Sequence, residues 1–375
     1  MSEHFDVCIR GAGVVGRTLA LLLARERLRV ALVATPEAPA SAPEVRAYAL
    51  NPASRQLLES LRAWPDGLSA TAVGSMQIWS DEGGDTPQLD FGAPYSAQVP
   101  HGSPAPLAWI VDVAGLTQTL EQAMRFQPQI ELVDAPVKAA LQVVCEGHKS
   151  SSRDEFGASW TVRPYPQHAI AARFESDKPH LGIARQWFKK GDILALLPLS
   201  GAAGNSVALV WSVSVESADA LQKLSPGDFA TAVHSVCGTV PGQLKLTSER
   251  ASWPLALSKA DRWVGPGWAL VGDAAHTVHP LAGQGLNLGL ADARELADVI
   301  AKREYWRGLG DEKMLRRYER ARKADVAAMA GVTDQLQGLF SQTDARWQAL
   351  RQWGMRGFAR SGPLKAWVAR QAAGL

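Results

Sequence analysis

The chain has 375 residues, of which 46% are hydrophobic and 20% are charged, and its formal net charge is +2. These values indicate a globular chain long enough for two lobes, and they exclude both a disordered chain and one whose overall basic field would attract nucleic acid. Cys8, Cys145 and Cys237 lie too far apart for a disulfide framework or a zinc site, which favours a reducing compartment. No segment approaches the roughly 20 apolar residues of a spanning helix, and the N-terminus lacks a signal-peptide pattern. We therefore expect a cytoplasmic protein.

A strand, a glycine-rich turn and a helix are predicted at the start of the chain. Residues 5–9 form a short apolar run, Gly11, Gly13 and Gly16 follow with G-x-G-x-x-G spacing, and a helical stretch leads to a second apolar run at residues 29–33. The first glycine of such a unit permits a tight turn, the second lets the backbone approach a pyrophosphate, and the third lets the helix pack on the strand. Free N–H groups at the helix start attract an anion. The unit predicts a dinucleotide site, and the alternative is a glycine-rich turn without a ligand.

The rest of the chain alternates between helical and strand patterns. Helices are expected at residues 52–64 and 113–124, strands and turns at residues 76–99, and a long β-rich block at residues 161–253. From about residue 318 the pattern is mostly helical. We therefore predict an α/β fold with a Rossmann-like nucleotide-binding domain of discontinuous segments, an inserted, mainly antiparallel sheet domain for substrate, and a helical C-terminus. The predicted boundaries are 1–75, 107–160 and 262–330 for the first domain, 76–106 and 161–261 for the second, and 331–375 for the C-terminal segment.

A second glycine-rich element lies between a predicted strand and a predicted helix near residue 280. It supplies a carboxylate, a proline, closely spaced glycines and the first helical residues: Gly272, Asp273, Pro280, Gly283, Gly285, Leu286 and Asn287. Asp273 is placed to accept hydrogen bonds from ribityl hydroxyls, and Pro280 stiffens the loop. Gly283 and Gly285 let the main chain lie close to a flat ring. The helix that follows directs its N–H groups at that ring and favours negative charge there by about 0.3 to 1 kcal/mol. We interpret the stretch as a flavin cradle; the alternative is a simple strand-loop-helix connection.

These motifs together resemble the class A flavoprotein monooxygenases, and within them the ubiquinone-biosynthesis hydroxylases that act on polyprenylated phenols. The family's Gly-Asp-Ala-Ala-His, Pro-Leu-Ala-Gly-Gln-Gly and Leu-Asn-Leu-Gly signatures stand at residues 272–276, 280–285 and 286–289. Further family-like stretches, among them RAYALNPASRQLLESL, PHLGIARQWF and LVWSVS, follow in order over nearly the whole chain.

The resemblance implies an FAD-dependent aromatic monooxygenase. NAD(P)H reduces FAD and leaves, O2 adds to the flavin, and the resulting hydroperoxide transfers one oxygen to an electron-rich ring. NAD(P)H is then a transient co-substrate, and no motif for a separate nicotinamide domain is found. The implied partners are O2 and a polyprenylated phenol or another small aromatic molecule, and we expect no nucleic acid. By the same resemblance the backbone of Pro280, Gly283 and Gly285 forms the flavin and oxygen face.

The resemblance also assigns residues to the cofactor. Arg46 would approach the FAD phosphates or the isoalloxazine side. Glu146 stands where the family has the aspartate of an Ala-Asp-Gly motif, and Ser150 and Arg153 match the S-x-x-R that follows it. The expected cofactor contacts are Gly11, Gly13, Gly16, Arg46, Glu146, Gly272, Asp273, Gly285, Leu286 and Asn287.

The chain departs from the family pattern at three places. The acidic residue that grips the adenosine ribose is replaced by Ala34, with Glu37 as a substitute candidate, Glu146 lengthens the arm of a carboxylate, and Arg10 stands at a usually apolar place. Loss of a charged hydrogen bond to the ribose costs about 1.5 to 3 kcal/mol. The departures motivate a rival hypothesis, a non-catalytic accessory subunit of a quinone-synthesis complex. Another small phenol is the alternative substrate.

Two further patterns were weighed. His276 and His279 have i, i+3 spacing, but no third ligand lies at suitable spacing, so we predict no metal. Residues 346–375 contain six Lys and Arg residues, four Trp and Phe residues and no Asp or Glu. This mixture is typical of membrane surfaces, and we expect the segment to dock peripherally on the inner membrane. Packing against the flavin domain and a contact within a homo-oligomer or a quinone-synthesis complex are the alternatives.

Overall fold

A parallel β-sheet organises one lobe of the protein. The computed structural model describes residues 4–34, 44–67, 69–80, 86–92, 106–189, 191–277 and 285–341. Five strands of this sheet, hereafter the parallel sheet, run in the same direction and one edge strand is antiparallel. The order across it is β16 (Val264–Gly265), β17 (Trp268–Leu270), β9 (Ala139–Val144), β1 (Phe5–Arg10), β2 (Val30–Val33) and β8 (Ile130–Val133).

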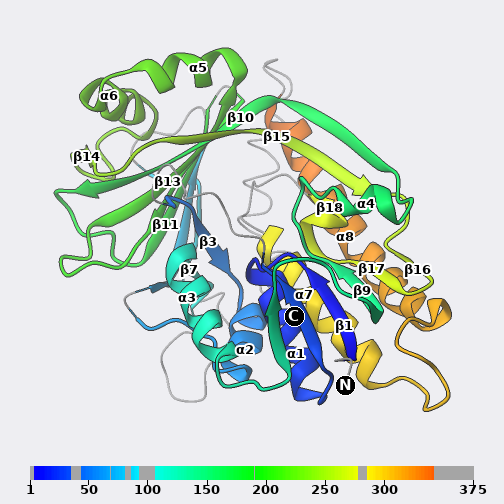
Figure 1. Cartoon of the computed structure of the whole chain (residues 1–375). Helices are drawn as coiled ribbons and strands as arrows, with labels where there is room; N and C mark the ends of the chain where they lie inside the picture. Colours follow the sequence, from blue (N-terminus) through cyan, green and yellow to red (C-terminus); the bar gives the residue numbers. More distant parts are fainter. Residues whose placement is uncertain are drawn as a thin grey trace.

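The strands of the parallel sheet come from three distant parts of the sequence. β2 is buried at every position, as expected for a parallel strand covered on both faces. α1 (Val14–Arg25) buries Leu19 and Leu23 and connects β1 to β2, and α7 (Gly285–Ala301) packs beside α1 (Figure 1). The predicted Rossmann-like arrangement of discontinuous segments is confirmed, while the residue boundaries proposed for the domains stay a proposal.

A small antiparallel sheet stands next to the parallel sheet. It contains β3 (Ala47–Leu50), β7 (Ala108–Asp112) and β4 (Ala70–Val73), in that order. Two helices adjoin it. α3 (Val113–Met124) has the predicted bounds, and its N-cap Asp112 accepts hydrogen bonds from the backbone N–H groups of Ala114 and Gly115. α2 (Pro52–Ser60) is shorter than predicted, because Arg62 adopts a positive φ of 54° that an α-helix cannot continue through.

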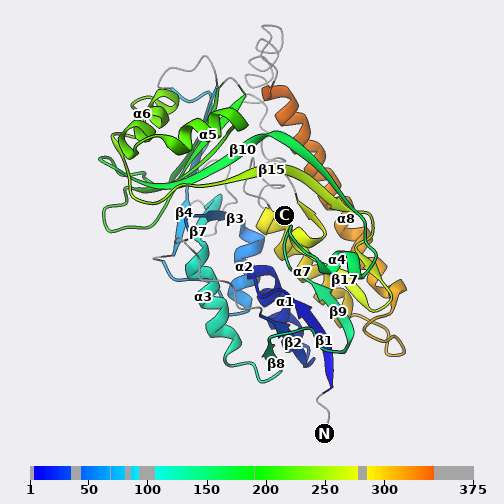
Figure 2. The ribbon, with the colours of Figure 1, turned by 45° about the horizontal axis from the view of Figure 1, so that its top comes forward.

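The inserted lobe is a nine-stranded sheet, hereafter the large sheet. Its strands pair antiparallel except for β5 and β11, which are parallel. α5 (Val215–Lys223) and α6 (Pro226–Cys237) cover the face that points away from the parallel sheet (Figures 1 and 2). The strand order is β18 (His276–Thr277), β15 (Ala251–Ala260), β10 (Trp160–Ser176), β13 (Ser206–Ser214), β12 (Asp192–Pro198), β11 (Ile183–Lys189), β5 (Ser75–Trp79) and β6 (Leu89–Phe91), with β14 (Leu244–Leu246) paired to β10.

Two long elements link the lobes. β10 and β15 form a ribbon that runs from the large sheet towards the parallel sheet, where the short helix α4 (Ser152–Glu155) precedes β10 (Figure 2). α8 (Glu312–Ser341) follows α7 and packs along both α7 and the edge of the parallel sheet. The buried Tyr318 donates its hydroxyl to the carbonyl of Leu270 at 2.8 Å. The C-terminal segment is thus helical up to Ser341, and residues 342–375 lie outside the described part of the chain.

Candidate functional site

Three turns meet at the carboxyl edge of the parallel sheet, which is where ligands bind in open α/β folds. The first follows β1, and its glycines are required by close packing. Gly11 has a φ of +106°, and a Cβ on it would lie 2.6 Å from the carbonyl oxygen of Cys145 in the turn after β9. A Cβ on Gly16 would lie 2.0 Å from the carbonyl oxygen of Gly11. Any larger residue at these two positions would push the turns apart.

Gly13 differs from its neighbours because open space surrounds it. No heavy atom lies within 4 Å of the place its Cβ would take. Gly13 is the N-cap of α1, and no side chain caps that helix end. The backbone N–H groups of the first turn of α1 are therefore directed at an open region, the arrangement that binds a pyrophosphate.

The second glycine-rich element packs directly on the first. Gly272 follows β17 with a φ of +65° and opens the 3-10 turn η2 (Gly272–Ala274). A Cβ on Gly272 would lie 3.5 Å from the side chain of Val15, and a Cβ on Gly289 would lie 2.8 Å from the same side chain. Val15 on α1 is thus the contact at which two motifs far apart in sequence converge. Gly285, at the start of α7, has no heavy atom within 4 Å of its Cβ position.

Asp273 presents an accessible carboxylate within this cluster of turns. The side chain is exposed, yet the surrounding protein removes enough bulk water to raise the pKa of the carboxyl, while the charges of His148 and Arg46 act in the opposite direction. Arg46 and Tyr48 share electrostatic interactions with Asp273, so the segment before β3 faces the η2 turn. Arg46 and Asp273, both predicted cofactor contacts, are brought together.

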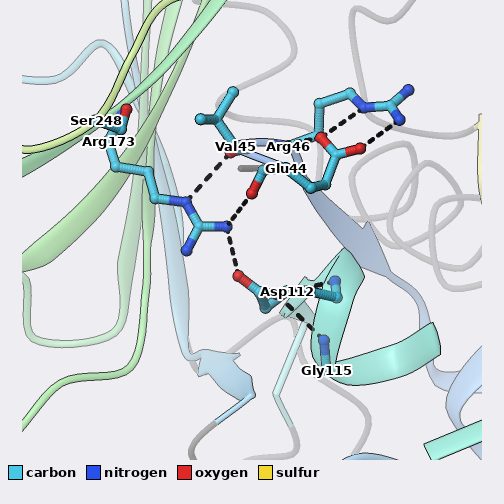
Figure 3. Close-up of polar contacts among 8 residues, drawn as sticks. Glu44, Val45, Arg46, Asp112, Gly115, Arg173 and Ser248 are labelled. Carbon is cyan, nitrogen blue, oxygen red and sulfur yellow. Dashed lines mark hydrogen bonds and ion pairs between the residues drawn. The ribbon is translucent and has the colours of Figure 1, made fainter. Parts of the chain in front are cut away.

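Arg46 is held by a neighbour that sequence analysis did not single out. Its Nε donates to Oε1 of Glu44 at 2.8 Å and its Nη2 donates to Oε2 at 2.5 Å, so the pair is bidentate (Figure 3). The hydrogen bond from Arg46 lowers the pKa of Glu44, and the same bond raises the pKa of Arg46. About half of the Arg46 side chain remains exposed. The guanidinium is thus fixed in direction and still accessible to an anion.

Glu146, in the turn after β9, forms hydrogen bonds within that same turn. Glu146 accepts hydrogen bonds from the hydroxyls of Ser150 at 2.6 Å and Ser152 at 2.8 Å. Ser150 and Ser152 are buried. The longer glutamate arm is therefore used within the turn, and Glu146 shapes the site through it.

Arg153 connects this turn to the η2 turn. It is 5% exposed, donates to the carbonyls of His148 at 2.7 Å and Ala274 at 3.3 Å, and lies 3.8 Å over the ring of Trp160. Burial lowers the pKa of Arg153. The S-x-x-R pattern thus fixes one turn against another.

Asp292 on α7 is the main site residue that the sequence did not reveal. It is fully buried and accepts hydrogen bonds from the backbone N–H of Gly272 at 3.0 Å, Nε2 of His276 at 2.7 Å and Nε of Arg322 at 2.7 Å. Burial alone would raise the pKa of the Asp292 carboxyl, but His276 and Arg322 outweigh it and hold that pKa below its usual value. Trp263 stacks on His276 at 4.7 Å between ring centroids. The network anchors the turn that carries Asp273.

Asn287 is engaged with protein atoms. Its Oδ1 accepts from the backbone N–H of Asn51 at 3.0 Å and the hydroxyl of Ser54 at 2.8 Å, and its Nδ2 donates to the carbonyl of Ala49 at 2.8 Å. The side chain is buried and joins α7 to the segment between β3 and α2. Leu286 beside it packs on the main hydrophobic core. We expect both residues to shape the site from behind.

The remaining predicted residues have varied positions. Pro280, Gly283, His279 and Glu37 lie outside the described residues. Ala34 directly follows β2, and its N–H donates to the carbonyl of Val133. Arg10 donates to the hydroxyl of Ser152 at 3.1 Å and pairs with Glu155 at 2.5 Å, which accounts for a cation at a usually apolar place. Within the described ranges no group of three His, Cys, Asp or Glu residues is placed to hold a metal, and no helix is long and apolar enough to cross a membrane.

The arrangement fits FAD. The open helix start at Gly13 suits the pyrophosphate, the accessible Asp273 carboxylate suits a polyhydroxyl chain, and the open start of α7 at Gly285 suits the electron-rich edge of a flat ring. Because Val15 contacts both glycine-rich elements, the two motifs pack against each other.

Comparisons with known proteins agree with this geometry. Residues 103–333 match the family described as FAD binding domain. The chain is 31% identical to ubiquinone hydroxylase UbiL of Rhodospirillum rubrum, over 98% of this chain and 89% of that protein. It is 28% identical to 3-demethoxyubiquinol 3-hydroxylase of Escherichia coli, over the full length of both. Among solved structures, the probable FAD-dependent monooxygenase PqsL of Pseudomonas aeruginosa has the same fold, with a TM-score of 0.77 and 22% identity over 95% of this chain and 100% of that one.

The family match spans more than half of the chain, and the similarity to the hydroxylases extends along nearly all of it. FAD is the cofactor that this family binds. This chain therefore belongs to the FAD-dependent monooxygenases, in the group of the ubiquinone-biosynthesis hydroxylases.

Proposed function

We propose that this protein hydroxylates the aromatic ring of a polyprenylated phenol in ubiquinone biosynthesis, with NAD(P)H as reductant and O2 as oxygen donor. The names of the relatives UbiL and 3-demethoxyubiquinol 3-hydroxylase support the pathway. The observation that carries the substrate class is the character of the large-sheet face that points to the small sheet.

That face is identified by strand register, because residues directly opposite in paired strands share one side of a sheet. Ala184, on β11, belongs to a cluster with Val73 and Ile110 of the small sheet, so its side of the large sheet is the inner side. The register places the following mostly small, apolar side chains on the inner face, hereafter the substrate wall: Ile78, Ala169, Ala171, Gln186, Ala195, Ala208, Val210 and Ser212. The same register places the larger Phe188, Ile193 and Leu197 and the charged Arg173 beside them on this face.

Most side chains of the substrate wall are small, and none of its eight members is charged. Four of its eight members are alanines, which leave more volume above a sheet than leucine or phenylalanine would. Gln186 and Ser212 are its polar members, and both are largely buried. Apolar surface with a small number of polar groups is the usual lining of a site for a mostly hydrocarbon ligand. A ring hydroxyl needs one or two such partners, and a prenyl chain needs none.

The chain's own residues then have three tasks. When bound and reduced, FAD supplies the activated oxygen for the ring. The turns at Gly13 and Asp273 hold the cofactor, Arg46 places positive charge beside it, and the substrate wall excludes water from the reacting ring. We find no need for a side-chain nucleophile.

The test is turnover by purified FAD-loaded protein. Short-chain prenylphenols would be incubated with NADH or NADPH in air, and the products analysed by mass spectrometry for the gain of one oxygen. We expect a hydroxylated prenylphenol, and faster conversion than for phenols of similar ring substitution without the prenyl group. Preference for the unprenylated phenols would support the small-phenol alternative. FAD-bound protein that oxidises neither class would support the accessory role and contradict the proposal.

We further propose that residues 346–375, which lie outside the described residues, dock the protein on an anionic membrane surface where a lipid-like phenol is found. Liposome flotation of the full chain would be compared with that of a chain ending at Asp344. We expect only the full chain to float with anionic vesicles, and equal flotation of the two would contradict this proposal.

A further inference from the structure

We propose that Arg173 is a positioning residue that fixes Arg46 at the flavin site by tying the large sheet to the backbone immediately before β3. This inference depends on the cofactor and not on which phenol is hydroxylated. It starts from the place of Arg173 in the middle of β10, next to Ala208 in the register with β13, which puts it on the inner face of the large sheet.

Within the described residues, the hydrogen bonds of the Arg173 guanidinium go to the segment before β3 and to the end of β7. Its Nε donates to the carbonyl of Val45 at 3.4 Å, and its Nη2 donates to the carbonyl of Glu44 at 3.2 Å and to the carboxylate of Asp112 (Figure 3). Asp112 also caps α3, so it is held from the other side. One side chain therefore joins three acceptors from two separate segments.

The backbone of Arg173 is equally fixed. Its N–H donates to the hydroxyl of Ser248 at 2.8 Å, and its carbonyl accepts from the N–H of Thr247 at 2.9 Å and the hydroxyl of Thr247 at 3.1 Å. The side chain is 28% exposed. An arginine held at its backbone and at its planar head transmits the position of one lobe to the other.

A cavity of about 300 Å³ adjoins Arg173 between the lobes. Residues of the small sheet and of the large sheet line it. Four hydroxyl groups line it together with Asp112 and Arg173, from Ser69, Ser200, Ser206 and Thr247. An apolar cluster that includes Ile110, Leu199 and Ala208 packs the lobes together beside this cavity, and Arg173 supplies polar contacts between the lobes at the same place.

The two carbonyls held by Arg173 belong to the residues immediately before Arg46. Glu44, whose carbonyl is one of them, also binds the Arg46 guanidinium with its carboxylate. Arg46 in turn shares an electrostatic interaction with Asp273. Movement of the 44–46 backbone would therefore carry the Glu44–Arg46 pair away from the flavin site, which is how Arg173 acts without touching the cofactor.

The experiment uses the full-length protein with Arg173→Met and Arg173→Lys substitutions. FAD affinity would be measured by flavin fluorescence on titrating the apoprotein, and amide hydrogen exchange of residues 44–50 would be measured without FAD. We expect Arg173→Met to weaken FAD binding roughly ten-fold, the effect of losing one charged hydrogen bond, and to speed that exchange. Arg173→Lys keeps the positive charge but not the planar guanidinium, so its FAD affinity and exchange rate should lie between those of the wild type and Arg173→Met. A positioning role also predicts a more negative flavin reduction potential in Arg173→Met, because the positive charge near the ring is less well placed.

Arg250→Met is the matched control. Arg250 also donates to two backbone carbonyls, those of Leu221 at 2.8 Å and Leu224 at 2.9 Å, but both lie within its own lobe. The Arg250→Met variant should have lower thermal stability, with unchanged FAD affinity and unchanged amide exchange at residues 44–50. Wild-type FAD affinity in Arg173→Met, or an equal loss in Arg250→Met, would overturn the proposal. If Arg173→Met does not fold, wild-type affinity and exchange in Arg173→Lys would overturn it equally.

Discussion

The turns after β1, β9 and β17, hereafter the flavin turns, and the substrate wall are stabilised by different kinds of contact. Around the turns, buried polar groups are paired with specific partners: Asp292 alone receives three hydrogen bonds, and Arg153 reaches carbonyls in two turns. On the wall, small apolar side chains such as Ala171 and Ala195 follow the strand register with two polar members among them. The first region is fixed by directional bonds and the second by side-chain volume.

The difference teaches where change is tolerated. A cofactor needs the same set of contacts in every member of a family, so directional bonds that admit one geometry suit it. Substrates differ, and a wall whose shape is set by methyl groups can be altered without unfolding the sheet. Substitutions at the turns should therefore remove FAD or stability, whereas substitutions on the wall should change substrate binding alone.

The largest effect is expected from a substitution of Gly16, and a substitution of Gly13 in the same turn serves as its control. Gly16→Ala would place a methyl group 2.0 Å from the carbonyl oxygen of Gly11, so we expect loss of FAD binding together with destabilisation of about 3 kcal/mol or more. Gly13→Ala is the matched control for packing, because its surroundings are open and its φ of −73° suits any residue. It should keep the apoprotein's melting temperature and lose FAD affinity, since the methyl group occupies the pyrophosphate's approach. Unchanged FAD binding in Gly13→Ala would contradict the assignment of the turn.

Asp292→Asn should be the next largest in effect. It removes the buried counter-charge of Arg322, and we expect a cost of about 3 to 5 kcal/mol in thermal or denaturant unfolding at neutral pH. Because the pKa of Asp292 is lowered in the folded protein, its stabilisation is present above the ordinary pKa of about 4 and is lost as the pH falls through the lower folded value. The difference in unfolding free energy between wild type and variant should therefore become smaller at acidic pH.

Asp325→Asn serves as its control. Asp325 binds the same arginine, at 2.6 Å, but its side chain is 67% exposed, and exposed pairs contribute little. A loss of stability in Asp325→Asn as large as that in Asp292→Asn would show that burial of the charge is not the cause.

These two sets of residues also mark what sequence can predict. The roles of Gly11 and Gly16 are readable because a tight turn after a strand restricts its residues locally, and the structure adds the atoms that enforce it. Asp292 lies in a helical stretch rich in charges, which resembles a solvated helix face. Only the docking of α8 brings Arg322 onto it, and no local pattern encodes that contact.

One predicted cofactor contact, Asn287, bonds to protein atoms through its side chain. Asn287 stands inside a signature of the cofactor site, and its motif does not indicate that Asn51, Ser54 and Ala49 take up its carboxamide. Those partners come from the segment between β3 and α2, more than two hundred residues away. A motif reports that a residue matters to a site, and long-range packing decides how.

A smaller effect is expected from an acid of the large sheet. Burial raises the pKa of Asp192 to about 6, and no charged group in the described part of the chain offsets it. The folded protein therefore loses stability as the pH rises from about 4, where the unfolded chain ionises, to about 6. Asp192→Asn should raise stability by about 1 to 2 kcal/mol above that window and by nothing below it. Thermal unfolding at several pH values would measure this, and the exposed Asp219→Asn on α5 should show no such dependence.

The smallest change tests the wall itself. Ala195 is half-buried and lies opposite Gln186 and Val210, so Ala195→Leu would add hydrocarbon to the substrate wall on the inner face of the large sheet. We expect KM for a prenylphenol to rise about ten-fold, as for a pocket short of one or two methylene volumes, with FAD affinity and reduction potential unchanged. Ala220→Leu, on the exposed side of α5, makes the same substitution without reaching the wall and should change neither. A fall in FAD affinity in Ala195→Leu would mean that the wall and the turns are not independent, because the added side chain would then have displaced the cofactor's own contacts.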